Sequence, residues 1–441
     1  MASSVLSILT VTYTIFILTT TYFLRSGVSF TVFSNHGFST TWTGFIESSM
    51  IFGNIGCFVL GIGPRMLARC STRQGWTGLC IVVIVTALIN GFLFHIPNRA
   101  VLLVVAVTSR AVQGALSFLG TMLYVDTVKL VAPEKFEVLL GVVGAGQMMG
   151  ITMSVTIGDV LVDHIGYTYA YLVVILFVVI ALGLCFTLLP SGPSFSSSRP
   201  TILETDQSVA EDRLSIFIVL PLLACVLENF CFGYVQIATT TYLHEDFDLS
   251  FSYAGAVVSL MGPANCLGSV LSGLFLQLNI LRADTQMILG VAILAVALFL
   301  LFAPTWAMGL HAAVPFTAFP AVFMVGFAET FVTFAALQVM YSMQEKKHGT
   351  LSPRHVLQIA AIWISGYATF FYASSLAAGA LMDVLPYQEL GMLLIVLCVV
   401  SAGTSGICRW VLNRADREDS DTDSESELLI KRRDDNGFIV Q

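Results

Sequence analysis

Long apolar stretches separated by short polar segments recur along almost the whole chain. Each holds about 20 residues with few or no charges, the length that an α-helix needs to cross the hydrocarbon core of a membrane. Twelve such spans are expected near residues 5–30, 43–63, 76–95, 101–124, 138–160, 167–189, 214–237, 253–276, 285–304, 311–340, 356–381 and 388–411. The pattern predicts an all-α membrane protein with twelve transmembrane helices.

Composition agrees with this interpretation. The chain is 56% hydrophobic and 11% charged, whereas a soluble domain is roughly one quarter charged. The first span lacks a basic leading segment and a small-residue cleavage site, so we expect a retained helix and not a signal peptide. Lipid bilayer is therefore the expected surrounding of most of the chain.

One long polar stretch divides the spans into two groups of six. Residues 190–213 are rich in serine and proline and then acidic, as in a flexible linker. We expect an N-terminal six-helix half at 1–189, a cytoplasmic linker at 190–213, a C-terminal six-helix half at 214–411 and a disordered acidic cytoplasmic tail at 412–441. Two halves with a site at their interface are a common transporter plan.

The basic residues predict an orientation. If both termini are cytoplasmic, 17 of the 20 Lys and Arg residues face the cytoplasm, and the opposite loops keep only Arg25 and Arg99. This asymmetry follows the positive-inside rule. Five of the seven histidines fall on the opposite side, which fits either an acidic lumen, since histidine titrates near pH ~6.5, or chance placement at helix ends.

Three charged residues interrupt the spans and are candidates for function. Glu228 lies in 214–237, Glu329 in 311–340 and Arg110 in 101–124. A charge at mid-membrane costs at least about 2.5 kcal/mol, so such residues usually carry ions, protons or charged substrates. Competition of a proton and an ammonium group for one buried carboxylate would produce exchange. The alternative is an acid neutralised by an arginine or by a neighbouring amide such as Asn229.

Spacing adds two further features. Arg110, Gly114, Ser117 and Thr121 share one helix face, with Gln113 alongside. Two roles for Arg110 stay open: a conformational lock that pairs with an acid or a helix end, and direct electrostatic gating of a cavity.

A stripe of small residues follows in the fifth span. Gly146, Gly150, Ser154 and Gly158 recur every four residues and are followed by Asp159. Small side chains on one face allow another helix to approach closely. We expect this stripe to serve helix packing and gating.

These motifs resemble those of the major facilitator superfamily. Arg110-Ala-Val-Gln-Gly114 is similar to its Arg-x-x-Gln-Gly signature, and the stripe ending at Gly158 is similar to its antiporter signature. More closely, the segments at 150–167, 231–234 and 252–275 resemble the vesicular amine transporters, in particular the vesicular polyamine branch. The resemblance implies alternating access with proton-coupled antiport of an organic cation, a polyamine or related amine, into an acidic vesicle.

Five residues are therefore expected to bind substrate or couple protons: Glu228 and Glu329 because they are acids within apolar spans, and Arg110, Gln113 and Gln236 because they lie at positions that the resemblance marks. Some positions depart from the family pattern. Asp159 stands at an expected glycine, and an acid expected in the seventh helix aligns with Gln236, eight residues after Glu228. Glu228 is therefore either a relocated substitute for that acid or a partner of Arg110.

The tail carries a candidate sorting signal. Glu425-Ser-Glu-Leu-Leu429-Ile430 fits an acidic dileucine pattern. It predicts binding to a clathrin adaptor and residence in a secretory-vesicle or endolysosomal membrane. A solvated acidic tail without a partner is the alternative.

Other classes of function have little support. The chain lacks the His-Glu-x-x-His, Gly-x-Ser-x-Gly and P-loop signatures, so we expect no enzyme activity, no catalytic residues, no cofactor, no metal and no nucleic-acid partner. The expected partners are a small organic cation and protons. Two alternatives remain: a carrier of an organic anion or neutral drug-like solute, and a receptor or scaffold that does not transport.

Overall fold

The computed structural model describes residues 2–26, 29–191, 216–245, 251–308, 314–348, 353–382, 384 and 387–435, and every regular element within them is helical. The helices are α1 (Ala2–Phe23), α2 (Ser29–Asn35), α3 (Thr40–Ser48), α4 (Met50–Val59), α5 (Ile62–Arg69), α6 (Thr72–Gly91), α7 (Arg99–Val131), α8 (Phe136–Ile165), α9 (Tyr167–Leu188), α10 (Val219–Glu245), α11 (Phe251–Ser259), α12 (Met261–Gln277), α13 (Ala283–Met308), α14 (Val314–His348), α15 (Pro353–Met382) and α16 (Tyr387–Asp435), with 3-10 turns η1 (Leu93–His95), η2 (Pro133–Lys135) and η3 (Ile216–Ile218).

Eleven stretches are long and apolar enough to cross a membrane. The difference from the predicted twelve lies at 43–63, where the helix is interrupted at Ser49 between α3 and α4. The Ser49 hydroxyl donates to the carbonyl oxygen of Ile46 at 2.6 Å. Serine side chains that bond to nearby backbone weaken the helical ladder. The sequence therefore supplies a twelfth apolar segment, but as two short helices.

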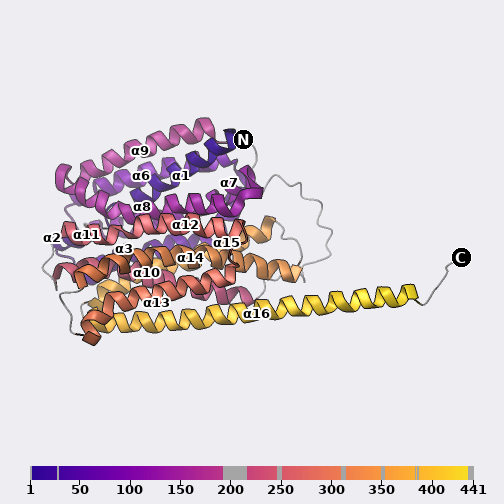
Figure 1. Cartoon of the computed structure of the whole chain (residues 1–441). Helices are drawn as coiled ribbons and strands as arrows, with labels where there is room; N and C mark the ends of the chain where they lie inside the picture. The colour runs from indigo at the N-terminus through magenta and orange to yellow at the C-terminus, as the bar shows by residue number, and fades with distance from the viewer. Residues whose placement is uncertain are drawn as a thin grey trace.

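The helices lie side by side in one bundle (Figure 1). Within it, α8 packs on α1 and also on α12, while α15 packs on α3, α4, α7 and α10. These contacts join segments from the two sequence halves. The predicted boundaries of the halves and of the linker remain predictions, and residues 192–215 lie outside the described part of the chain.

Small residues set how closely α8 approaches its neighbours. A Cβ on Gly150 would stand 2.6 Å from the carbonyl oxygen of Phe16 in α1, and one on Gly158 would overlap that of Leu24. Across the helix, a Cβ on Gly141 would stand 2.5 Å from the carbonyl oxygen of Ser269 in α12. Since real Cβ atoms avoid such distances, α8 must keep glycine on both sides.

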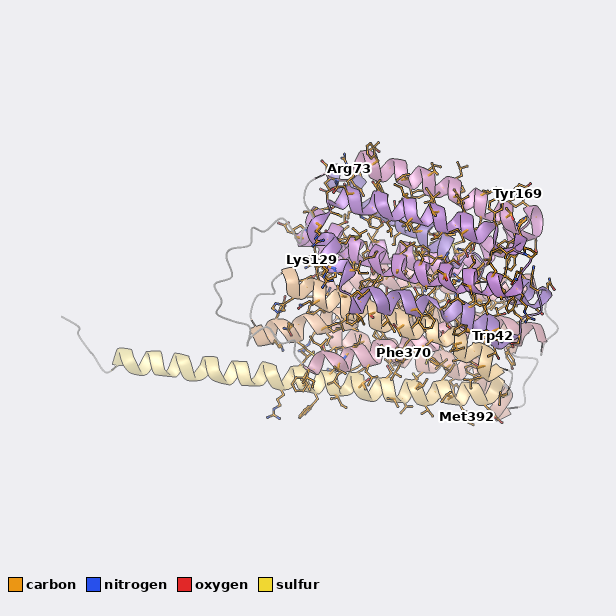
Figure 2. All side chains as sticks on the ribbon, turned by 180° about the vertical axis from the view of Figure 1, so that it is seen from behind. Trp42, Arg73, Lys129, Tyr169, Phe370 and Met392 are labelled. Carbon is orange, nitrogen blue, oxygen red and sulfur yellow. The ribbon has the colours of Figure 1, made fainter. Side chains whose placement is uncertain are left out.

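The two ends of the bundle differ in their side chains. Arg73 and Lys129 lie at the end where α16 leaves the bundle, which we name the tail end, and Trp42 and Tyr169 lie at the opposite end (Figure 2). Trp42 is 48% and Tyr169 64% exposed, as expected of aromatic residues at a membrane boundary.

Helix α16 continues well past the bundle (Figure 1). Residues 412–435, which the sequence predicts to be disordered, are helical in the structure. Between residues 407 and 435 the chain has neither glycine nor proline, so nothing in this stretch breaks a helix already started within the bundle. Glu425, Leu429 and Ile430 lie in this extension.

Candidate functional site

A buried ionic cluster occupies the first half of the chain. Glu47, on α3, accepts hydrogen bonds from Arg25 Nε at 3.0 Å, from Ser29 Oγ at 2.7 Å and from Arg110 Nη2. Ser26 Oγ also donates to it at 3.4 Å. We call Arg25, Glu47 and Arg110 the Glu47 cluster. It ties the end of α1 and the middle of α7 to the short helix α3.

Both arginines make further bonds. Arg110 Nη1 donates to Gln113 Oε1 at 3.0 Å and to the carbonyl oxygen of Tyr22, while Arg25 Nη1 donates to Asn90 Oδ1 at 2.9 Å. Arg110 is therefore paired with an acid, but that acid is Glu47 and not Glu228. The suggestion that Glu228 is its partner is wrong.

The sequence does not predict two features of this cluster. The sequence predicts Arg25 in a loop on the opposite side, yet it is 1% exposed inside the bundle. Glu47 is not among the predicted site residues, although it interrupts the apolar run 43–63 as Glu228 interrupts the run 214–237. The same criterion, an acid within an apolar span, would have identified it.

The second half holds a different pair of acids. Glu228 on α10 and Glu329 on α14 are both 0% exposed. Asn229 Nδ2 donates to Glu228 Oε2 at 3.4 Å and to Thr333 Oγ1 at 2.9 Å, and Thr333 Oγ1 donates to Glu329 Oε1 at 3.1 Å. We call Glu228, Asn229, Thr333 and Glu329 the acid relay. Hydrogen bonds thus join the two carboxyl groups.

The acid relay lacks a positive partner in the described part of the chain. No Lys, Arg or His there forms an ion pair with either acid, and Glu228 Oε1 and Glu329 Oε2 are buried without a hydrogen-bond partner. Burying two carboxylates together without a cation is costly. The site therefore favours the uptake of protons or of a cationic group.

An aromatic pocket adjoins the acid relay between the two halves. Its lining comes from α7, α8, α10 and α15: Ser117, Gln147, Met148, Ile151, Asn229, Phe232, Tyr367, Ala368, Phe371 and Tyr372. Tyr372 Oη donates to Ser117 Oγ at 3.1 Å, and the Phe232 and Phe371 rings stack with centroids 5.8 Å apart. Asn229 belongs to both the pocket and the acid relay, and so connects them.

Other predicted residues lie apart from this pocket. Gln113 belongs to the surroundings of Arg110. Gln236 is 8% exposed on α10, about two turns beyond Glu228, and does not line the pocket. Asp159 is partly buried towards the opposite end of α8, where a Cβ on Gly255 of α11 would stand 3.7 Å from its Oδ2. The aromatic residues of α15 were not singled out, because their pattern does not differ from that of a lipid-facing helix.

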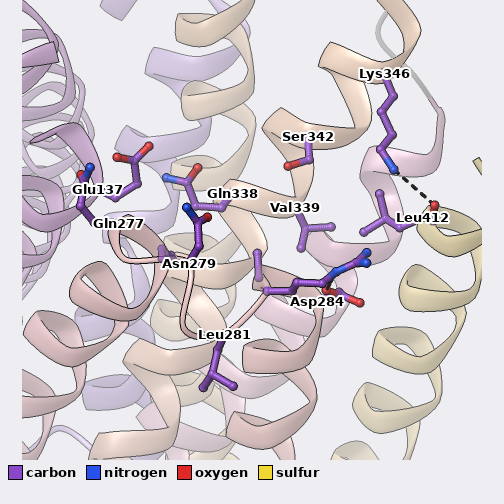
Figure 3. Close-up of a pocket in the computed structure, with 13 residues that line it drawn as sticks. Glu137, Gln277, Asn279, Leu281, Asp284, Gln338, Val339, Ser342, Lys346 and Leu412 are labelled. Carbon is purple, nitrogen blue, oxygen red and sulfur yellow. Dashed lines mark hydrogen bonds and ion pairs between the residues drawn. The ribbon is translucent and has the colours of Figure 1, made fainter. Parts of the chain in front are cut away.

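A second, polar pocket opens at the tail end (Figure 3). There Asp284 Oδ1 pairs with Arg282 Nε at 3.1 Å and Asp284 Oδ2 with Arg409 Nε at 3.7 Å. Lys346 Nζ donates to the carbonyl oxygen of Leu412 at 3.3 Å, the dashed line in Figure 3. These contacts fasten α16 to α13 and α14. No residue of the acid relay lines this pocket.

Metal binding finds no support in the described residues, since no three His, Cys, Asp or Glu side chains among them gather around one point. The nine cysteines are all free thiols.

The sequence profile of the Major Facilitator Superfamily matches residues 14–352, most of the chain. The chain belongs to the major facilitator superfamily. It is thus a multi-pass membrane protein of a transporter family and not an enzyme, and its class of substrate is a small solute. A search of curated proteins finds no match, so the resemblance to the vesicular amine branch stays a prediction.

Proposed function

We propose that this chain is a proton-coupled antiporter of organic cations, a polyamine or a related amine. The observation that carries the proposal is the acid relay: two fully buried carboxyl groups without a basic partner in the described part of the chain, joined through Asn229 to a pocket between the halves. A site that is more stable with a proton or an ammonium group bound than when empty supports obligatory exchange of one for the other.

The aromatic pocket supports a cationic substrate. The faces of Phe, Tyr and Trp rings attract ammonium groups, with about 0.5–2 kcal/mol per contact. Phe232, Phe371 and Tyr372 offer such faces next to Asn229. The pocket has a free volume of about 20 Å³, room for about one water, so in this proposal it widens to admit the substrate, and the acid relay holds the charge that balances the substrate.

The polyamine branch, the acidic organelle and the adaptor-binding tail belong to the same proposal. The histidines outside the membrane, the dileucine pattern around Leu429 and the resemblance to the vesicular amine transporters support them. The proposed orientation places the tail end in the cytoplasm.

A carrier of organic anions is the second candidate. It is favoured by the Glu47 cluster, where two guanidinium groups face one carboxylate. The aromatic pocket and the acid relay favour the cation instead.

Uptake by proteoliposomes distinguishes these candidates. We expect accumulation of radiolabelled spermidine when the lumen is acidic, and inhibition by unlabelled polyamines and quaternary amines but not by carboxylates. Glu228→Gln and Glu329→Gln should each lower uptake at least about tenfold, whereas Glu389→Gln, which alters an exposed acid of α16, should not. Inhibition by carboxylates alone would favour the anion carrier.

A further inference from the structure

The Glu47 cluster contains one more positive charge than negative. Arg25 and Arg110 both pair with Glu47, and the three residues are 1%, 0% and 8% exposed. Among the described residues, no second acid lies within 4.0 Å of either guanidinium group. A buried net charge is strongly unfavourable unless another charge compensates it.

Unpaired donors surround the same place. Arg25 Nη2 and Arg110 Nε are buried and find no hydrogen-bond acceptor in the part of the chain that the structure describes. The neighbouring hydroxyls of Tyr167 and Tyr171 are also buried, and no third group there hydrogen-bonds to either of them. Buried N–H and O–H groups are rarely left unsatisfied in proteins. Each of these four groups is able to donate to an anion.

These donors belong to one region of the bundle. Arg25 lies two residues beyond the end of α1, and Arg110 donates to the carbonyl oxygen of Tyr22 near that end. The Tyr167 and Tyr171 rings of α9 have centroids 5.3 Å apart, and both phenols lie near Arg110. Tyr167 lies near Arg25 as well. Helices α1, α7 and α9 thus direct donors and excess positive charge to the same interior.

We infer that the Glu47 cluster binds a small monovalent anion, with chloride as the abundant physiological choice. One negative charge neutralises the excess, and the guanidinium and phenol groups supply donors. A divalent anion would reverse the imbalance, and a cation would increase it. The three residues of the cluster are almost fully buried, which favours a compact ion.

The proposed site differs from the substrate site. It draws on α1, α3, α7 and α9, whereas the acid relay belongs to α10 and α14. An anion at the Glu47 cluster would stabilise the end of α1 against α3 without touching the transported solute. Its presence or absence is therefore independent of whether the solute is a cation.

Chloride binding to the purified full-length protein tests the inference. Sodium chloride replaces sodium gluconate at constant ionic strength while the melting temperature and the binding of radiolabelled chloride are measured. We expect a saturable rise in melting temperature and saturable binding. Arg25→Gln, which removes the excess charge, should abolish both. Arg99→Gln, which changes an arginine outside the cluster, should leave both unchanged.

A second variant covers the case in which Arg25→Gln does not fold. Tyr167→Phe removes one donor and keeps the charge, so chloride affinity should fall about fivefold, as for the loss of one hydrogen bond. A melting temperature that depends on ionic strength alone, or wild-type chloride binding in both variants, would overturn the inference. A water molecule bound in place of the anion would give a melting temperature that depends on ionic strength alone.

Discussion

The three buried glutamates differ in what surrounds them. Glu47 is ion-paired with Arg25 and Arg110. These ion pairs stabilise its charged form, so Glu47 is unsuited to exchange a proton for a substrate cation. Glu228 and Glu329 have no such partner among the described residues and share a hydrogen-bonded path through Asn229 and Thr333. We therefore assign stability to Glu47 and exchange to the acid relay.

Glu47→Gln tests the assignment of stability to Glu47. The substitution leaves two guanidinium groups buried without a carboxylate, and breaking a buried pair in this way costs about 3–5 kcal/mol. We expect a large fall in the melting temperature of the detergent-purified protein. Glu389→Gln, at an exposed acid, serves as control, and equal melting temperatures for the two variants would contradict the assignment.

Thr333→Val tests the assignment of exchange to the acid relay. The valine has nearly the shape of threonine but cannot donate to Glu329 or accept from Asn229. A hydrogen bond to a charged group contributes about 1.5–3 kcal/mol, so gradient-driven uptake should fall roughly tenfold or more. Thr333→Ser keeps the hydroxyl and should retain uptake. If the valine and serine variants show the same gradient-driven uptake, the acid relay is not part of the mechanism.

At the scale of elements, glycines decide which helices touch. A Cβ on Gly53 of α4 would overlap the carbonyl oxygen of Ala111 in α7, and one on Gly114 of α7 would overlap that of Met50. The two helices are therefore in backbone contact. This contact holds α4 beside Arg110, while α3, beyond the break at Ser49, packs on α15.

Two alanine substitutions on α4 separate packing from helix propensity. Gly53→Ala should reduce the yield of folded protein sharply, because the new methyl group has no room. Gly56→Ala, with nothing within 4 Å of the new Cβ, should be neutral or stabilise by about 0.5–1 kcal/mol through helix propensity. The readout is the fraction of monodisperse protein in gel filtration, and comparable yields would contradict the close contact.

Much of the fold, but less of the candidate site, can be predicted from the sequence. Apolar length predicts nearly every long helix because a membrane span needs about 20 such residues. It does not predict the break at Ser49, because the number of apolar residues carries no information on local backbone geometry. Buried acids such as Glu228 stand out by composition. The pocket around Phe371 and Tyr372 does not, because only tertiary packing distinguishes an interior aromatic residue from a lipid-facing one.

At the scale of the molecule, the aromatic pocket lies between two seams that join the halves. Towards the tail end, α8 packs on α12, where a Cβ on Gly273 would stand 2.6 Å from the carbonyl oxygen of Glu137. At the opposite end, α3 packs on α15, where a Cβ on Gly44 would stand 3.6 Å from the Cα of Gly379. Alternating access requires that these seams open in turn.

A disulfide across the second seam tests this requirement. A Cβ on Gly44 would stand 3.6 Å from the Cα of Gly379, and a Cβ on Gly379 would stand 3.5 Å from the Cα of Gly44. This close approach suits a disulfide in the double variant Gly44→Cys with Gly379→Cys, since the Cβ atoms of a disulfide lie about 3.5–4.5 Å apart. Oxidation should stop uptake and a reductant should restore it, while each single variant should be insensitive to both. Full transport by the oxidised, cross-linked protein would show that the opposite end does not need to open there.

The central claim, exchange of an organic cation for protons at the acid relay, is tested most directly by substrate-driven proton movement. Proteoliposomes loaded with a pH-sensitive dye receive spermidine outside, with no gradient imposed beforehand. The account predicts that the lumen becomes more alkaline as spermidine enters, and that Glu228→Gln and Glu329→Gln abolish this change. Spermidine uptake with no change in lumenal pH would contradict it.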